Sequence, residues 1–445
     1  MSWLQHTTTK PNGPRWNEKD KAYKTHVEDW IDHYKERILQ EADLQAITML
    51  PPNARKITIE RIVHQMIDEE KVILPSHEIK EIIENIINDS VGYGPLEELL
   101  HDQSISEIMV NGPQDIYIER QGKLEKVSTR FKDEKHIRHI IDRIIAPIGR
   151  RVDESSPMVD ARLPDGSRVN AVIPPISING PSMTIRKFRD TPFTIDNLIE
   201  FGTFSQPMAS FLEAAVKAKV NILVSGGTGS GKTTLLNVLS AAIPSGERVV
   251  TIEDMAELRF TYDNIVRLEA RPSNMEGKGE VSIRQLVKNA LRMRPDRIVV
   301  GEVRGSEAID MLQAMNTGHE GSLTTVHANT PKDALGRLEA MVVMSGLPLT
   351  VDVIRGYFVS AIHLIVQTER LPDGSRRVVT IAEVSQDEHG IQINDLFRFH
   401  KTGQTNKGRI IGEFRATGLK PQVLQRFAYY GVSYSWLGES GEKLE

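Results

Sequence analysis

Residues 224–234 run Val-Ser-Gly-Gly-Thr-Gly-Ser-Gly-Lys-Thr-Thr, and this stretch decides the fold of the chain around it. Apolar residues precede it (Val220, Ile222, Leu223), and apolar residues at helical spacing follow it. The glycines therefore lie between a predicted strand and a predicted helix. In that context, a glycine-rich turn points its backbone N–H groups inward at a helix N-terminus and binds phosphate. The alternative is a glycine-rich turn that binds nothing.

The predicted phosphate-binding residues occupy the whole loop. They are Gly226, Gly227, Thr228, Gly229, Ser230, Gly231, Lys232, Thr233 and Thr234. The Lys232 ammonium is expected to reach the β- and γ-phosphates, and the Thr233 hydroxyl to bind Mg²⁺. The sequence thus predicts a site for ATP and Mg²⁺.

The composition is that of a globular protein with room for two or three domains. The chain has 445 residues, of which 39% are hydrophobic, and no cysteine, so disulfides, cysteine-ligated zinc and a thiol nucleophile are excluded. No stretch approaches the roughly 20 apolar residues that span a bilayer, and no apolar signal-peptide core is present, so we expect a cytoplasmic protein. A net charge of -5 provides no overall basic field for nucleic acid, although a local basic channel stays possible.

Hydrophobic periodicity predicts three domains. Amphipathic segments over residues 1–90 predict an all-helical domain, whose isoleucines form either a core, which we favour, or a partner-docking face. Short alternating strands around one helix predict a small α/β domain over residues 91–190. Residues 191–205 are expected to connect it to residues 206–445. There, β-branched strands alternate with helices, which predicts an α/β domain with a mainly parallel sheet, RecA-like in outline, and a C-terminal β-segment.

Acidic and histidine residues stand at the ends of the predicted strands. Glu253 and Glu302 directly follow buried strands, where they either serve hydrolysis or cap the next element. His319 and His327 flank a third strand. A lone histidine is usually structural, but at a strand end near the loop it could sense the γ-phosphate. Hydrolysis needs groups that hold Mg²⁺, orient water and meet charge on the γ-phosphate, so all four are candidates.

Three arginines alternate with apolar residues in strands of the smaller domain: Arg162, Arg168 and Arg186. Each either projects from a sheet face or is an ordinary solvated charge. The first two flank a Leu-Pro-Asp-Gly-Ser turn that recurs, letter for letter, between Arg370 and Arg376. Shared turn chemistry explains both copies, and we expect the second copy to be structural.

The motifs together resemble those of a known family. They are residues 226–234, residues 251–254 (Thr-Ile-Glu-Asp), residues 294–304 and residues 317–329. This series is similar to the Walker A, Asp-box, Walker B and His-box motifs of the secretion ATPase superfamily, which powers type II and type IV secretion and type IV pili. The resemblance covers roughly residues 92–366.

The branch within this superfamily is suggested by three further features. The chain lacks a cysteine-ligated zinc element, carries a helical front end, and has Gly-Arg-Arg-Val-Asp at residues 149–153 leading to Asp-Ala-Arg at residues 160–162. These look most like the tight-adherence (Flp) pilus assembly ATPases. Type IV secretion ring ATPases and archaeal pilus or archaellum motors are the alternatives.

The resemblance implies a motor. Its members are homohexameric ring ATPases, peripheral at the cytoplasmic face of the inner membrane, in which a small PAS-like domain closes over nucleotide held by the RecA-like domain. ATP turnover moves a membrane platform protein of the pilus or secretion system, and no stable nucleic-acid partner is expected.

Roles carried over from the family fall on matching positions. Glu253 matches the water-activating glutamate, and Glu302 would hold Mg²⁺ through water. His327 and His319 match the His-box histidines. The arginines that the smaller domain brings to the phosphates match Arg162, Arg168 and Arg186.

Other classes of nucleotide-binding protein are less compatible with the sequence. A nucleic-acid motor would be expected to interleave aromatic and basic residues, which this chain does not do. A metabolite kinase does not need the additional small domain. An ABC-type ATPase requires a second signature loop, and none is present outside the phosphate loop.

Overall fold

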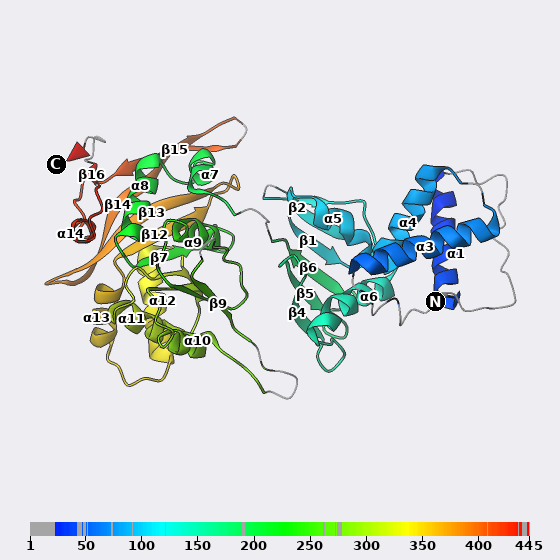
Figure 1. Ribbon diagram of the computed structural model, residues 1–445. Coiled ribbons are helices and arrows are strands. Elements are labelled where there is room, and N and C mark those ends of the chain that lie inside the picture. The colour runs from blue at the N-terminus through cyan, green and yellow to red at the C-terminus, as the bar shows by residue number, and fades with distance from the viewer. Residues whose placement is uncertain are drawn as a thin grey trace. The chain divides into compact units, whose positions relative to one another are not determined.

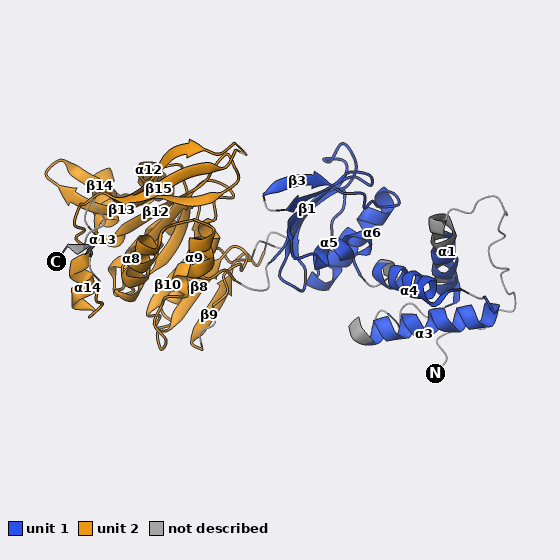
Figure 2. Ribbon diagram, turned by 90° about the horizontal axis from the view of Figure 1, so that it is seen from above, with its two compact units in different colours: residues 1–189 blue, residues 190–445 orange. Residues whose placement is uncertain are grey.

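The computed structural model describes most of the chain (Figure 1). Described residues are 23–41, 47, 50, 52–72, 74–90, 92–120, 122–188, 192–260, 263–271, 273, 278–406, 408–434, 436–437 and 443–444. They form two compact units, residues 1–189 and residues 190–445 (Figure 2). Thr191, where the predicted connection begins, lies outside the described residues. Within the described part of the chain, no helix is both long and apolar enough to cross a membrane.

The described part of unit 1 begins with the helices α1 (Tyr23–Glu41), α3 (Pro52–Glu70) and α4 (Ser76–Ser90). They share one hydrophobic cluster, in which Tyr34, Ile62 and Ile86 are buried. The preference for a core role of the isoleucines is confirmed, because the apolar stripes of the helices face one another.

The rest of unit 1 is an antiparallel sheet covered by one long helix. After the short helices η1 (Gly94–Leu96) and α5 (Glu97–His101), the sheet has the order β3-β2-β1-β6-β5-β4. Its strands are β1 (Ile105–Asn111), β2 (Ile116–Arg120), β3 (Lys123–Lys126), β4 (Met158–Arg162), β5 (Arg168–Val172) and β6 (Ser182–Arg186). Helix α6 (Glu134–Ile145), followed by η2 (Ala146–Ile148), buries its isoleucine stripe in the cluster formed with this sheet. This cluster is separate from the one between the first three helices.

Unit 2 is built on a mixed nine-stranded sheet with the order β15-β14-β13-β12-β7-β11-β10-β8-β9. Its parallel strands are β7 (Ile222–Gly226), β8 (Val249–Glu253), β9 (Ile265–Glu269), β10 (Arg297–Val303), β11 (Leu323–His327) and β12 (Leu364–Arg370). Strands β13 (Arg376–Asp387), β14 (Gly390–Gln404) and β15 (Ile410–Ala416) continue it in antiparallel fashion. The predicted C-terminal β-segment is therefore part of the main sheet, because the turn after β12 returns the chain along that strand.

Helices cover both faces of this sheet (Figure 1). Ile222 and Val224 of β7 belong to the cluster with α8 (Gln206–Lys217) and α9 (Lys232–Ser240), whereas Leu223 belongs to the opposite cluster. That second cluster contains α10 (Ile283–Ala290), α11 (Glu307–Asn316), α12 (Pro331–Met344) and α13 (Val351–Ala361). Burial on both faces explains the continuous apolar runs of the parallel strands. The other described elements of unit 2 are the helices α7 (Ile195–Glu200) and α14 (Leu424–Tyr429) and the short strands β16 (Trp436–Leu437) and β17 (Lys443–Leu444), which pair with each other.

One buried side chain joins the beginnings of three of these strands. Asn221, directly before β7, accepts hydrogen bonds from the N–H groups of Gly321 (2.7 Å) and Ser322 (3.1 Å), which precede β11. Its amide nitrogen donates to the carbonyl oxygen of Ala361 at 2.7 Å, near the start of β12. The backbone N–H of Asn221 donates to Nδ1 of His363 at 2.9 Å, and burial lowers the pKa of His363 to about 4, which keeps that ring neutral.

We expect Asn221→Ala to lower the free energy of unfolding by at least about 3 kcal/mol, because it leaves several buried backbone groups without a partner. Urea unfolding followed by circular dichroism measures this change. The matched control is Asn394→Ala, which removes a single contact to the Ser385 hydroxyl on β14 and should cost about 1 kcal/mol or less. Equal destabilisation by the two substitutions would contradict the role given to Asn221.

Candidate functional site: a phosphate loop and the strand ends beside it

The predicted phosphate loop joins β7 to α9. Strand β7 ends at Gly226, and α9 starts at Lys232, directly after Gly231, which has a φ of 96°. A Cβ atom on Gly226 would lie 2.3 Å from Oγ1 of Thr368 and 2.4 Å from Oγ of Ser230, so only glycine fits there. The strand, tight glycine turn and helix are thus the arrangement that the sequence predicts for anion binding at a helix start.

The side chain of Lys232, at the start of α9, reaches back to the loop. Nζ of Lys232 donates to the carbonyl oxygen of Gly227 at 3.0 Å. Burial lowers the pKa of Lys232, and the nearby Glu302 carboxylate opposes this change. Thr228 and Gly229 are exposed at the loop tip, whereas Thr233 and Thr234 are half-buried in the first turn of α9.

The register of the sheet brings the other predicted residues to the same edge. His327, the last residue of β11, lies directly opposite Gly226 of the neighbouring β7. Glu302 is near the end of β10, which pairs with β11, and Glu253 ends β8, on the other side of β10. Because the carboxyl ends of parallel strands meet at one edge, these three residues lie at the same edge of the sheet as the loop.

The Glu253 carboxylate is buried and held by backbone amides. Its Oε1 accepts hydrogen bonds from the N–H groups of Glu257 (2.8 Å) and Leu258 (2.9 Å). Its Oε2 is buried with no hydrogen-bond partner among the described residues. Burial raises the pKa of Glu253, and the two amides oppose that rise. A Cβ on Gly301 would lie 3.0 Å from Cγ of Glu253, so this glycine of β10 leaves room for the carboxylate. A fixed, partly desolvated carboxylate is suited to accepting a proton.

Glu302 is bound by an arginine to which the sequence analysis assigned no role. Oε2 of Glu302 accepts from Nη2 of Arg304 at 2.6 Å, and Nη1 of the same arginine is 3.3 Å from Oδ2 of Asp254. The hydrogen bond with Glu302 raises the pKa of Arg304. Glu302 and Arg304 are two residues apart, and this spacing puts side chains of an extended chain on the same face. This spacing could have indicated their pairing from the sequence.

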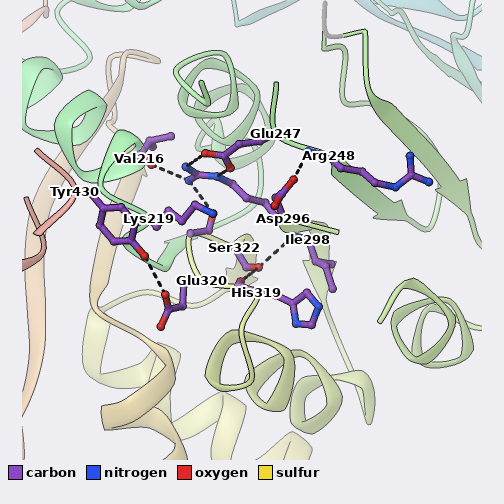
Figure 3. A network of polar contacts seen from close by, with 12 residues as sticks. Val216, Lys219, Glu247, Arg248, Asp296, Ile298, His319, Glu320, Ser322 and Tyr430 are labelled. Carbon is purple, nitrogen blue, oxygen red and sulfur yellow. Dashed lines mark hydrogen bonds and ion pairs between the residues drawn. The ribbon is translucent and has the colours of Figure 1, made fainter. Parts of the chain in front are cut away.

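The two predicted histidines lie at opposite edges of the sheet. His327 is at the phosphate-loop edge, where burial and the charges of Lys232 and Arg337 lower its pKa. His319 precedes β11, and its carbonyl oxygen accepts from the Ser322 hydroxyl at 2.6 Å, in the network at the starts of the strands (Figure 3). The structure therefore does not bring His319 to the loop, because a whole strand separates it from His327.

The network around His319 is structural in character. The guanidinium of Arg297, at the start of β10, is fully buried and contacts Glu247 at 2.6 Å. It also donates to the carbonyl oxygen of Val216 at 2.7 Å. Figure 3 shows Glu247, Val216 and Ser322 in the same group of contacts.

The three predicted arginines form a row across the sheet of unit 1. Arg162 of β4 lies opposite Arg168 of β5, which in turn lies opposite Arg186 of β6. Nε of Arg186 donates to Oε1 of Glu107 on β1 at 2.8 Å. The register therefore places the three arginines side by side in a row of basic residues. These arginines belong to unit 1, whereas the loop belongs to unit 2.

The residues at the loop fit Mg²⁺ only when a nucleotide is bound as well. Among the described residues, no group of three or more acidic, histidine or cysteine side chains is placed to hold a metal ion by itself. The Thr233 hydroxyl and the Glu302 carboxylate are oxygen donors of the kind that Mg²⁺ accepts together with substrate phosphates and water. The donor set therefore fits an ion that arrives with ATP.

Comparisons with known proteins identify the family. The family model described as type II/IV secretion system protein matches residues 89–394. A protein of Mycobacterium tuberculosis strain CDC 1551 named for conjugal transfer is 38% identical over 307 residues, which cover 68% of this chain and 87% of the relative. The conjugal transfer protein TrbB of Rhizobium radiobacter is 34% identical over 320 residues, covering 69% of this chain and 94% of the relative.

Solved structures give matches of the same kind. The VirB11 ATPase of the Brucella suis type IV secretion system, crystallised with sulphate, is 30% identical, with a TM-score of 0.36, and the match covers 65% of this chain and 92% of that one. None of the relatives described here is named for tight-adherence pili, so the branch expected from the sequence lacks support. With its family motifs and the match over residues 89–394, the chain belongs to the type II/IV secretion system family, and it is an ATPase of that family.

Proposed function

We propose that this chain is the ATP-hydrolysing motor of a type IV secretion system of the kind used in conjugal transfer. The observation that carries the proposal is the meeting of Lys232, Glu253, Glu302 and His327 at one edge of the unit 2 sheet. The transport system is suggested by relatives named for conjugal transfer and type IV secretion. These relatives favour the type IV secretion ring ATPase over the tight-adherence pilus motor that the sequence first suggested.

The proposal gives each residue a chemical task. The amides of residues 227–233 and the Lys232 ammonium bind the phosphates of ATP. The Thr233 hydroxyl, and the Glu302 carboxylate through water, hold Mg²⁺, which neutralises phosphate charge when it is bound. Glu253 orients the attacking water and accepts its proton. His327, kept neutral by its surroundings, donates to or accepts from groups at the γ-phosphate.

The wider organisation is part of the same proposal. Unit 2 is the RecA-like ATPase domain over residues 206–445, joined by residues 191–205 to a PAS-like domain over residues 91–190 and a helical domain over residues 1–90. The chains assemble as a homohexameric ring at the cytoplasmic face of the inner membrane, bound there through a platform protein and with no stable nucleic-acid partner. In this proposal, Arg162, Arg168 and Arg186, which form one row in the unit 1 sheet, supply positive charge for the phosphates.

We expect Glu253→Gln to retain ATP binding and to lower the hydrolysis rate at least about 100-fold, because the amide cannot accept a proton from water. Because burial raises the pKa of Glu253 and this group works ionised, the wild-type rate should fall on acidification at a pH above the ordinary carboxyl range. Phosphate release and fluorescent-nucleotide binding, measured across pH, report both quantities.

The control for this substitution is Glu339→Gln, which changes an acidic residue of α12 that is bound to Arg355. It should keep the wild-type rate. A Glu253→Gln variant that hydrolyses ATP like wild type would remove the catalytic assignment, and one that no longer binds Mg²⁺-ATP would reassign Glu253 to metal binding.

Assembly of the chains into a ring should affect the rate of ATP turnover. If the site is completed in a ring, ATP turnover per chain should rise cooperatively with protein concentration and then saturate. Arg168→Gln should lower the saturated rate at least about tenfold while ATP still binds, because positive charge is lost where negative charge develops. Turnover measured over a wide range of concentrations tests both expectations. Constant turnover per chain down to dilute monomer would contradict the ring.

A further inference from the structure

The hairpin between β12 and β13 lies against the phosphate loop. It contains the second Arg-Leu-Pro-Asp-Gly-Ser-Arg sequence, residues 370–376, and folds as the first copy does. In both copies the serine N–H donates to the aspartate, Ser167 to Asp165 at 2.8 Å and Ser375 to Asp373 at 3.0 Å. The equal turns put the two flanking arginines opposite each other in each copy.

In the second copy, this arginine pair reaches the tip of the loop. Nε of Arg376 donates to the carbonyl oxygen of Gly229 at 2.8 Å. A Cβ on Gly229 would lie 3.6 Å from Nη1 of Arg370, and one on Gly231 would lie 3.5 Å from Cδ of Arg376. Two guanidinium groups therefore stand on the side of the loop that faces away from Glu253 and Glu302.

The strand that leads into this hairpin holds the base of the loop. Thr368 lies opposite Gly226 in the parallel pairing of β12 with β7. Its hydroxyl is 2.8 Å from the Ser230 hydroxyl and donates to the carbonyl oxygen of Ser225 at 3.1 Å. The loop thus stays anchored through Thr368 when the side chain of Arg376 is changed.

The contact made by Arg376 acts on the orientation of a peptide group in the loop. A peptide C=O points away from the N–H of the same peptide group, and the cradle needs its N–H groups to point inward. Arg376 binds the carbonyl oxygen of Gly229, whose peptide group carries the N–H of Ser230, and that N–H donates to the carbonyl oxygen of Gly227 at 3.4 Å. Arg376 therefore fixes the orientation of a peptide group at the tip of the loop. Arg370 and Arg376 lie opposite each other in the hairpin, and both guanidinium groups attract a polyanion bound in the cradle.

We propose that Arg370 and Arg376 are positioning residues for the triphosphate, acting within the same chain from the flank of the loop opposite the acidic residues. Arg376 holds the loop in its phosphate-binding form, and the pair adds positive charge that raises the affinity for phosphate groups. The inference rests on the ATP site proposed above and adds a binding task that is separate from hydrolysis. It gives the second copy a role beyond the structural one that the sequence suggests.

The test compares Arg376→Gln and Arg376→Lys with wild type. The affinities for ATP and for inorganic tripolyphosphate are measured by calorimetry at low and high salt, together with kcat, KM and the thermal midpoint. Arg376→Gln should weaken both affinities about tenfold, raise KM similarly and leave kcat within about threefold, with an unchanged thermal midpoint. Arg376→Lys should recover part of the loss, because it keeps the charge and a donor, and the difference from wild type should shrink at high salt.

The matched control is Arg398→Gln, which changes an exposed arginine of β14 bound to Asp395 and should behave like wild type. Unchanged tripolyphosphate affinity in Arg376→Gln, or a lower kcat at unchanged affinity, would overturn the inference. Lys232→Ala separates this failure from that of the underlying site. If Lys232→Ala abolishes ATP binding but Arg376→Gln binds normally, only the role of the hairpin is wrong; if Lys232→Ala binds ATP like wild type, the proposed ATP site is wrong.

Discussion

The functional site depends on a buried amide at the opposite edge of the sheet. The side chain of Asn221 fixes the beginnings of β11 and β12 on either side of β7, through bonds to Gly321, Ser322 and Ala361. Each strand advances about 3.3 Å per residue, so fixing the starts and the register also fixes where the strands end. As a result, His327 and Thr368 both arrive beside Gly226. The chemistry at one edge is thus set by hydrogen bonds at the other.

Charged side chains are arranged differently at the two edges of the sheet. At the starts of the strands, Arg297 is fully buried and its partners are Glu247 and backbone carbonyls, so its charge is fully matched. At the carboxyl edge, three cationic side chains lie around the glycine loop, and one of them is bound to an acidic side chain. Lys232 and Arg376 bind carbonyl oxygens of the loop itself, and Arg304 binds Glu302. These cations lie around a loop whose amides and helix N-terminus already favour anions, which makes this edge suited to a triphosphate.

The features that could be predicted from the sequence are those formed by residues close together in the chain. The glycine pattern predicted the position of the loop between a strand and a helix, because the strand, the turn and the helix are consecutive in the sequence. Glu253 and Glu302 were found because they follow buried strands, and parallel strands end at a common edge. Changes in hydrophobic period predicted three domains, two of them with a sheet, whereas the structure divides into two compact units because the N-terminal helices and the first sheet fall in the same unit. Within unit 2, however, the C-terminal strands join the main sheet, a pairing that depends on contacts distant in sequence.

The remaining differences between the sequence predictions and the structure depend on contacts between residues that are far apart in the chain. His319 and His327 are eight residues apart and both resemble family positions, but the five residues of β11 carry them to opposite edges of the sheet. Arg376 is far from the loop in sequence and reaches it only because the hairpin returns along the sheet beside β7. The row of Arg162, Arg168 and Arg186 likewise requires the register of three strands. The branch of the family could not be derived from motifs that all its branches share, and the proposal for it rests on the names of relatives.

We propose that ATP is bound and hydrolysed at the carboxyl edge formed by β7, β11, β10 and β8. An experimental structure of the full chain with Mg²⁺ and a non-hydrolysable ATP analogue tests it most directly. We predict that the triphosphate lies in the amides of residues 227–233, with Mg²⁺ on the Thr233 hydroxyl and Glu253 beside the γ-phosphate. A nucleotide bound elsewhere, with the loop between β7 and α9 empty, would contradict the account.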